Sequence, residues 1–129
     1  NQALYINRGL YTPDIIFEHN GKVSMFDVIT CAAPNKAAAQ KYQNVSDEKN
    51  HAALQSRIEF VLNIAEENKV DTLILGAYGC GVFGQDPEEV AAIFKILLPY
   101  YNFKKIIFAI PKGNGNFEKF IEGWKPKEN

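Results

Sequence analysis

Apolar positions along the chain follow two periods, one typical of strands and one typical of amphipathic helices. Apolar runs at Val23 to Thr30 and Lys104 to Ile110 predict buried strands, Asp71 to Leu75 predicts a short apolar strand, and Leu10 to Phe17 predicts a more exposed one. Helical spacing predicts three helices with these apolar positions: Leu54, Ile58, Val61, Leu62 and Ala65; Val90, Ile93, Phe94, Leu97 and Leu98; Phe117, Phe120, Ile121 and Trp124.

The helix boundaries carry their own signals. We expect the first helix at about residues 49–68, after a polar surface loop from Gln40 to Asn50. The second helix is predicted to have Asp86 as its N-cap and Pro87 at its first position, with Glu89 placed to reach back to the cap. The last helix is expected to be capped near Asn114 to Asn116.

Alternating strands and helices predict an α/β fold in which parallel strands are joined by right-handed crossovers. The 129 residues, 47% of them hydrophobic, fit one globular domain spanning 1–129. In such folds ligands bind beyond the carboxyl ends of the strands. Three segments rich in Gly, Pro and Asn are expected there: Cys31 to Asn35, Gly76 to Gly84 and Pro111 to Asn116.

Composition narrows the function classes. A formal net charge of −1 gives no argument for nucleic-acid or membrane-surface binding, and no stretch resembles a transmembrane span. Cys31 and Cys80 do not make a disulfide framework, which favours a cytoplasmic location. They and the two scattered histidines, His19 and His51, have no metal-ligand spacing, so neither a metal nor a resident cofactor is expected.

The glycine-rich segment between the second predicted helix and the strand before it is the main candidate site. The strand ends at Gly76, and glycines follow at positions 79, 81 and 84. A strand, a glycine loop and a helix in this order expose backbone N–H groups and let a ligand approach the main chain closely. The loop is therefore predicted to bind a pyrophosphate.

Two other chemistries are compatible with parts of this loop. Gly79 to Gly84 matches the G-x-G-x-x-G pattern of NAD-binding Rossmann folds, but the helix cap follows the last glycine, and Ala109 to Lys112 offers no carboxylate for a ribose. Cys80 lies near a helix N-terminus, a position that lowers a thiol pKa, yet the sequence identifies no histidine partner for a nucleophile. A small buried cysteine is the simpler interpretation.

At this point the residues resemble a known family. The run from Leu73 to Pro87 is similar to the diphosphate loop of microbial-type poly(ADP-ribose) glycohydrolases, a branch of the macrodomain superfamily. Val28 to Asn35 is similar to a second motif of that family, and Phe108 to Phe117 resembles its last strand and helix. The resemblance covers nearly the whole chain. It implies a three-layer α/β/α sandwich with a mixed, largely parallel sheet that binds ADP-ribose.

The resemblance also implies ligand-binding roles for individual residues. Backbone amides of about Gly79 to Phe83 would hold the two phosphates, and Phe83 would pack against the distal ribose, the alternative being a loop aromatic tucked into the core. Asn35 would cap the floor of the site or bond a ligand hydroxyl, the alternative being a pure turn role. For Phe117 core packing is favoured over adenine contact. The implied ligand-binding set is Gly76, Ala77, Gly79, Cys80, Gly81, Val82, Phe83, Gly84, Asn35, Asn116 and Phe117.

One part of the family pattern is missing. These glycohydrolases carry a three-glycine loop followed by Gln-Glu-Glu, whose glutamate acts on the glycosidic bond, whereas this chain has no adjacent glycines and no Gln-Glu-Glu. Glu88 and Glu89 begin a helix, and Glu66 and Glu67 end one, so we expect no catalytic residue in this chain.

Two hypotheses follow. Either the chain is the C-terminal portion of a glycohydrolase whose catalytic loop lies on an N-terminal segment or a companion chain, or it is a non-catalytic module that reads ADP-ribose or ADP-ribosylated proteins.

Overall fold

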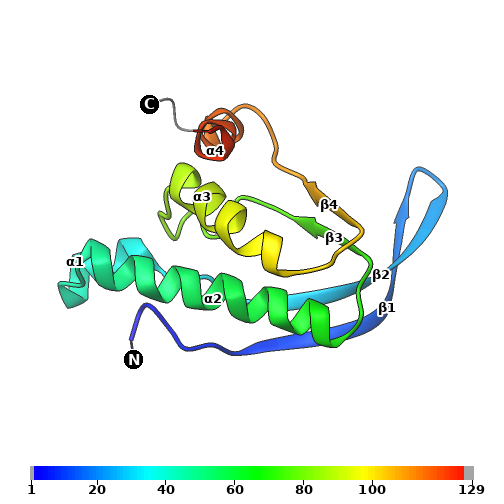
Figure 1. Cartoon of the computed structure of the whole chain (residues 1–129), viewed down its shortest axis with the longest axis horizontal. Coiled ribbons are helices and arrows are strands. Elements are labelled where there is room, and N and C mark those ends of the chain that lie inside the picture. The colour runs from blue at the N-terminus through cyan, green and yellow to red at the C-terminus, as the bar shows by residue number, and fades with distance from the viewer. Residues whose placement is uncertain (1, 127–129) are drawn as a thin grey trace.

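The structure is a computed structural model that describes residues 2–126 of the chain (Figure 1). The elements, in chain order, are β1 (Gly9–His19), β2 (Lys22–Cys31), α1 (Lys36–Gln43), α2 (Asp47–Glu67), β3 (Thr72–Leu75), α3 (Pro87–Leu97), the short 3-10 helix η1 (Leu98–Tyr100), β4 (Lys105–Phe108) and α4 (Asn116–Trp124). The predicted α/β class and the three predicted helices are therefore confirmed, and α1 is an additional helix.

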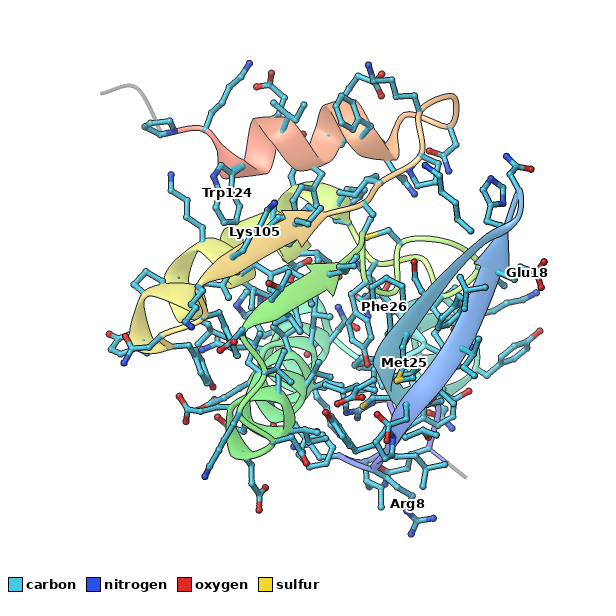
Figure 2. The ribbon with its side chains drawn as sticks, turned by 90° about the vertical axis from the view of Figure 1, so that its right-hand side faces the viewer. Arg8, Glu18, Met25, Phe26, Lys105 and Trp124 are labelled. Atoms are coloured by element: carbon cyan, nitrogen blue, oxygen red, sulfur yellow. The ribbon has the colours of Figure 1, made fainter. Side chains whose placement is uncertain are left out.

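The described strands form two separate two-stranded sheets. Strands β1 and β2 make an antiparallel hairpin with a bulge between Thr12 and Ile15. Strands β3 and β4 pair in parallel, with Thr72 opposite Lys105 and Leu75 opposite Phe108, and α3 forms the crossover between them. Strands β2 and β3 are not hydrogen-bonded to each other, although both lie in the part of the molecule that faces the viewer in Figure 2.

The hydrophobic core lies between the helices and the parallel pair of strands. In Figure 2, α2 and α3 lie behind the strands, and α4 lies along the upper edge. Apolar stripes of these helices meet the inward side chains of β3. The fully buried cluster consists of Leu54, Ile58, Leu62, Ala65, Leu73, Val90, Ala91, Ile93, Phe94, Leu98 and Phe120, with Phe108 and Ile106 of β4 packed against it.

Three expectations about burial and loops are wrong. The predicted buried strand at Lys104 to Ile110 is β4, whose residues alternate between exposed and partly buried, with Ile107 37% exposed. The predicted buried strand at Val23 to Thr30 is the largely exposed β2, in which only Val28, Ile29 and Cys31 are partly buried. The predicted loop from Gln40 to Asn50 contains the end of α1 and the first turn of α2. Its polar residues up to Lys49 lie on the exposed sides of two helices whose N-caps, Asn35 and Ser46, accept backbone hydrogen bonds, whereas Asn50 is buried.

The start of α3 follows its sequence signals in part. Asp86 is the N-cap, with Oδ1 3.0 Å from the N–H of Glu88, and Pro87 is the first helical residue. The reach-back predicted for Glu89 is wrong, because its carboxylate contacts His51 Nδ1 of α2 at 2.6 Å. Helix α4 begins at Asn116 after Gly115, which has a positive φ of 84°. The cap expected near Asn114 to Asn116 comes from Asn114, whose Oδ1 accepts the N–H of Asn116 at 3.1 Å.

Among residues 2–126 no helix is long and apolar enough to cross a membrane. The same residues contain no group of three or more His, Cys, Asp or Glu side chains arranged to hold a metal ion.

Candidate functional site

The glycine-rich loop between β3 and α3 is built on close backbone approaches. Gly79 and Gly84 have positive φ values of 75° and 74°. A Cβ atom at Gly79 would lie 2.9 Å from Ala33 Cβ and 2.8 Å from Gln85 Cγ, so any side chain there would collide with its neighbours. These two glycines are therefore required by the path of the loop itself.

The centre of the loop is open and rich in free donors. The N–H groups of Gly81, Val82 and Phe83 have no hydrogen-bond acceptor among the described residues. Val82 is 92% exposed, and a Cβ added at Gly81 would meet nothing within 4 Å. Successive unpaired N–H groups in a turn favour the binding of an anion. The N-terminus of α3 is already occupied by its own Asp86 carboxylate, so the anion position belongs to the loop amides.

The segment after β2 lies directly against this loop. The hydroxyl of Tyr78 donates to the carbonyl of Cys31 at 2.9 Å, and the N–H of Ala37 donates to the carbonyl of Phe83 at 3.0 Å. Asn35 caps α1, since its Oδ1 accepts from the N–H of Ala38 at 3.0 Å. In this structure the Asn35 side chain therefore has a turn role, and its Oδ1 is occupied.

The segment after β4, residues 111–116, also contacts the glycine-rich loop. Asn116 Nδ2 donates to the carbonyl of Cys80 at 3.4 Å, which links the start of α4 to the glycine loop. The core role favoured for Phe117 is wrong, because Phe120 is the buried aromatic of α4. Phe117 is half-buried instead, with Lys112 Nζ 4.9 Å from its ring centroid. The three segments expected beyond the strand ends are thus brought together.

Phe83 lies at the rim of the loop and not in the core. Its ring is half-buried and contacts Tyr5 with centroids 6.1 Å apart and planes at 53°. Beside this ring pair is a hollow of about 710 Å³ that also involves Tyr5. The residues lining it are Gln2, Tyr5, Ile6, Arg8 and Ala32. Sequence reasoning missed Tyr5, because the first nine residues carry no periodic pattern.

A buried pair of side-chain amides, Gln85 and Asn50, holds the end of the loop in place. Gln85 is 3% exposed, and its Nε2 donates to the carbonyl of Pro34 at 2.8 Å, while Asn50 Nδ2 donates to Gln85 Oε1 at 2.9 Å. These bonds tie α2, the loop and the segment before α1 into one unit. Buried polar groups that are fully satisfied in this way hold a loop in one conformation.

Arg57 has a related structural role on α2. Its guanidinium is almost fully buried and donates to three acceptors: Asn7 Oδ1 at 2.8 Å, the carbonyl of Ala32 at 2.6 Å and the carbonyl of Leu4 at 2.9 Å. It thereby fixes the chain before β1 against the end of β2. The only sequence signal for this role is a charged residue within the apolar stripe of a helix.

The titratable groups of the loop are held neutral. Burial raises the pKa of Cys80 from 9.0 to about 12, and the nearby carboxylates of Asp86 and Glu89 add to the shift. Burial also raises the pKa of Tyr78, as does its hydrogen bond with Cys31. Because the thiolate is the reactive form of cysteine, these surroundings argue against a Cys80 nucleophile.

Solved structures of bacterial poly(ADP-ribose) glycohydrolases resemble this chain. The enzyme from Deinococcus radiodurans in complex with ADP-ribose has a TM-score of 0.84 and 28% identity, over 95% of this chain and 53% of that chain. A mutant of the enzyme from Thermomonospora curvata has a TM-score of 0.84 and 29% identity, over 95% and 51%. The Thermomonospora curvata enzyme bound to the inhibitor ADP-HPD has a TM-score of 0.83 and 28% identity, over 94% of this chain and 50% of that chain.

Other comparisons are negative. No family model matches the chain, and no curated protein does. The chain spans about half of the length of the solved structures that it matches. At this level of similarity the likeness confirms the expected fold: the chain has the α/β fold of the macrodomain-like poly(ADP-ribose) glycohydrolases.

Proposed function

We propose that the chain binds ADP-ribose, with the glycine-rich loop holding the diphosphate. The observation that carries this proposal is the run of unpaired N–H groups at Gly81, Val82 and Phe83 in an open loop. The glycohydrolases that share this fold include structures bound to ADP-ribose and to an inhibitor, which supports the same ligand here.

The surroundings of the loop suit the rest of such a ligand. The Phe83 ring, half-buried at the rim and backed by Tyr5, offers a flat apolar face to a sugar. Asn116 at the start of α4 contacts Cys80 and is followed by Phe117, so a base joined to the diphosphate would reach this end of α4. Gly76 and Ala77 lead from β3 into the loop. We assign them, with Gly79, Cys80 and Gly84, to the support of the phosphate-binding amides.

We further propose that the whole protein is a poly(ADP-ribose) glycohydrolase whose catalytic carboxylate is supplied from outside residues 2–126. Hydrolysis of a glycosidic bond needs a carboxylic acid beside the leaving oxygen. The carboxylates next to the loop have other partners: Asp86 caps α3, and Glu89 contacts His51. The described residues would therefore hold the ligand and leave bond cleavage to another segment.

Calorimetry with ADP-ribose tests the binding site. Gly81→Glu places a carboxylate in open space next to the proposed phosphate position, without strain, since Gly81 has ordinary backbone angles and no near neighbour. We expect this variant to weaken ADP-ribose binding by about a hundredfold or more, because like charges then meet beside the loop amides.

Two matched variants separate charge from shape. Gly81→Gln adds a side chain of the same size without the charge and is expected to lose clearly less affinity than Gly81→Glu. Tyr100→Glu adds a charge at an exposed residue of η1 and should leave binding unchanged. Equal affinities of the wild-type and Gly81→Glu proteins, or binding of NADH without ADP-ribose, would contradict the proposal.

Release of ADP-ribose from poly(ADP-ribose) separates the enzyme from a reader module. The 129-residue chain is expected to bind the polymer without releasing ADP-ribose, whereas the complete protein, with any segment or chain that accompanies it, is expected to release it. Release by the 129 residues alone would place a catalytic acid within them. Binding without release by the complete protein would instead favour the non-catalytic reader.

A further inference from the structure

A groove separates the hairpin from the parallel pair of strands. It has a volume of about 760 Å³ and is lined by residues of the β1–β2 hairpin on one side and of β3, with the turn that precedes it, on the other. Figure 2 looks into this part of the molecule, with Met25 and Phe26 labelled on the hairpin side. The two bordering strands are not paired with each other, so each has a free edge.

The direction of the backbone groups of β3 can be worked out from its partners. The carbonyls of Asp71 and Leu75 accept from the N–H groups of Lys104 and Ala109 at 2.9 and 2.8 Å, so these residues face β4. Successive residues of a strand point their N–H and C=O groups to opposite sides. Thr72 and Ile74 therefore present theirs to the groove, where the described residues offer them no partner.

Several large apolar side chains that line the groove are exposed. Phe17 is 48% exposed, Met25 61%, Phe26 44% and Ile74 51%. A contiguous exposed apolar surface of this kind marks a site that another polypeptide or a ligand covers. The lining also includes polar residues, among them Asp27, Asn68 and Asp71.

The size of the groove fits one strand. A strand advances about 3.3 Å per residue, lies about 4.8 Å from its neighbours and fills a layer about 10 Å thick, or roughly 160 Å³ per residue. A groove of about 760 Å³ therefore holds about five residues in extended conformation. That length matches the four residues of β3, Thr72–Leu75.

We propose that an extended polypeptide strand of about five residues occupies this groove, pairs with both β2 and β3, and joins the two sheets into one. The occupant we infer is a strand of the polypeptide that supplies the remainder of the fold, because the similar solved chains are about twice as long as the part this chain matches. A strand whose backbone bonds to both edges satisfies the free groups of Thr72 and Ile74.

A small ligand suits the groove less well than a strand. Its borders are two rows of backbone donors and acceptors with a regular repeat, and only another backbone matches both rows. This proposal does not depend on ADP-ribose binding, because the groove and the glycine loop use different residues apart from Gly76 and Tyr78.

Residue-resolved amide hydrogen exchange tests the proposal on the protein isolated from the cells that make it, with all polypeptide joined or bound to it. The amides of Leu73 and Leu75 face β4 and serve as internal references. With the strand in place, Thr72 and Ile74 should exchange within about tenfold of these references. Exchange at Thr72 and Ile74 more than about a hundredfold faster would overturn the proposal. Protection that rises with protein concentration would identify a second copy as the occupant and would overturn it as well.

A substitution in β3 makes the test specific. Ile74→Pro removes an N–H that points into the groove but none that bonds to β4, so it should speed exchange at Thr72 about a hundredfold or more and leave β3–β4 pairing intact. If this variant does not fold, Met25→Lys, which places a charge in the apolar lining, should have the same effect on Thr72. Ile96→Lys, at an exposed residue of α3 outside the groove, is the control. Unchanged protection of Thr72 in both groove variants would contradict the proposal.

Discussion

The helix-backed half of the molecule and the β1–β2 hairpin use apolar residues in opposite ways. In the first, α2, α3 and α4 bury a continuous cluster against β3 and β4. In the second, large apolar side chains such as Leu10, Ile16 and Val23 are mostly exposed. The two halves have similarly apolar sequences. The hydrophobicity of a residue therefore does not tell whether it is buried in the core of this chain or left exposed for another polypeptide to cover.

The glycine-rich loop belongs to the well-packed half. Its outer N–H groups are free, but its base is fixed by the Gln85–Asn50 amide pair and by close contact of Gly79 with Ala33. A binding loop gains from such support, because its donors are then held in place before the ligand arrives. The groove beside β2 lacks this support on one side, which is why we assign it to protein association and the loop to a small ligand.

The largest expected difference between the halves concerns truncation of a side chain. Leu62→Ala in α2 removes a residue with no exposed surface from the centre of the core and should lower the free energy of unfolding of the 129-residue chain by about 3 kcal/mol. Met25→Ala in the exposed β2 should change it by less than about 0.5 kcal/mol. Denaturant unfolding of both variants measures the difference, and equal losses would remove the contrast on which the groove proposal is based.

A smaller but sharper contrast concerns two glycines. A Cβ atom at Gly123 of α4 would lie 2.3 Å from the carbonyl oxygen of Glu88 in α3, so Gly123→Ala must push the two helices apart. The expected cost is about 2 kcal/mol of unfolding free energy. Gly81→Ala fills open space at an ordinary φ and should cost less than about 0.5 kcal/mol. Thermal unfolding measures both, and a Gly123→Ala protein as stable as Gly81→Ala would mean that α4 does not pack closely on α3.

Much of the helix-backed half could be predicted from sequence, because each helix carries a periodic apolar stripe and α3 has a local cap in Asp86 and Pro87. The loop was recognisable for a similar reason, since its glycines report backbone requirements within a few residues of one another. Long-range contacts had no such signal. Nothing near Glu89 indicates that His51 is its partner, and nothing near Phe83 indicates Tyr5.

The exposure of β2 could not be predicted from the sequence either, and the physical reason is different. An apolar run such as Val23 to Thr30 indicates a surface that avoids water, but the sequence does not say which polypeptide covers it. The same limit applies to Phe117 and Phe120, which share the apolar stripe of α4. Only the position of α4 on α3 decides that Phe120 is buried and Phe117 lies at the rim.

The smallest expected effect lies within the hairpin and depends on pH. The hydroxyl of Tyr11 donates to the carboxylate of Asp27, which also accepts the N–H of Asp14 at 3.0 Å beside the bulge. The hydrogen bond to Asp27 raises the pKa of Tyr11 from 10.0 to about 12, and the bond from Tyr11 lowers the pKa of Asp27. Because the folded pKa of Tyr11 lies above the unfolded one, its contribution to hairpin stability is fully present below pH 10 and is lost as the pH rises through 12.

Titration of tyrosinate absorbance, with the Tyr11 signal identified by Tyr11→Phe, measures this coupling. Asp27→Asn removes the charge that opposes ionisation and should bring the Tyr11 pKa back toward 10, whereas Glu18→Gln in the same strand should leave it unchanged. A Tyr11 midpoint unaffected by Asp27→Asn would show that the pair does not form. The Asp27 carboxylate would then hold the bulge of β1 only through the N–H of Asp14, and the hairpin would depend still more on the strand proposed to cover its free edge.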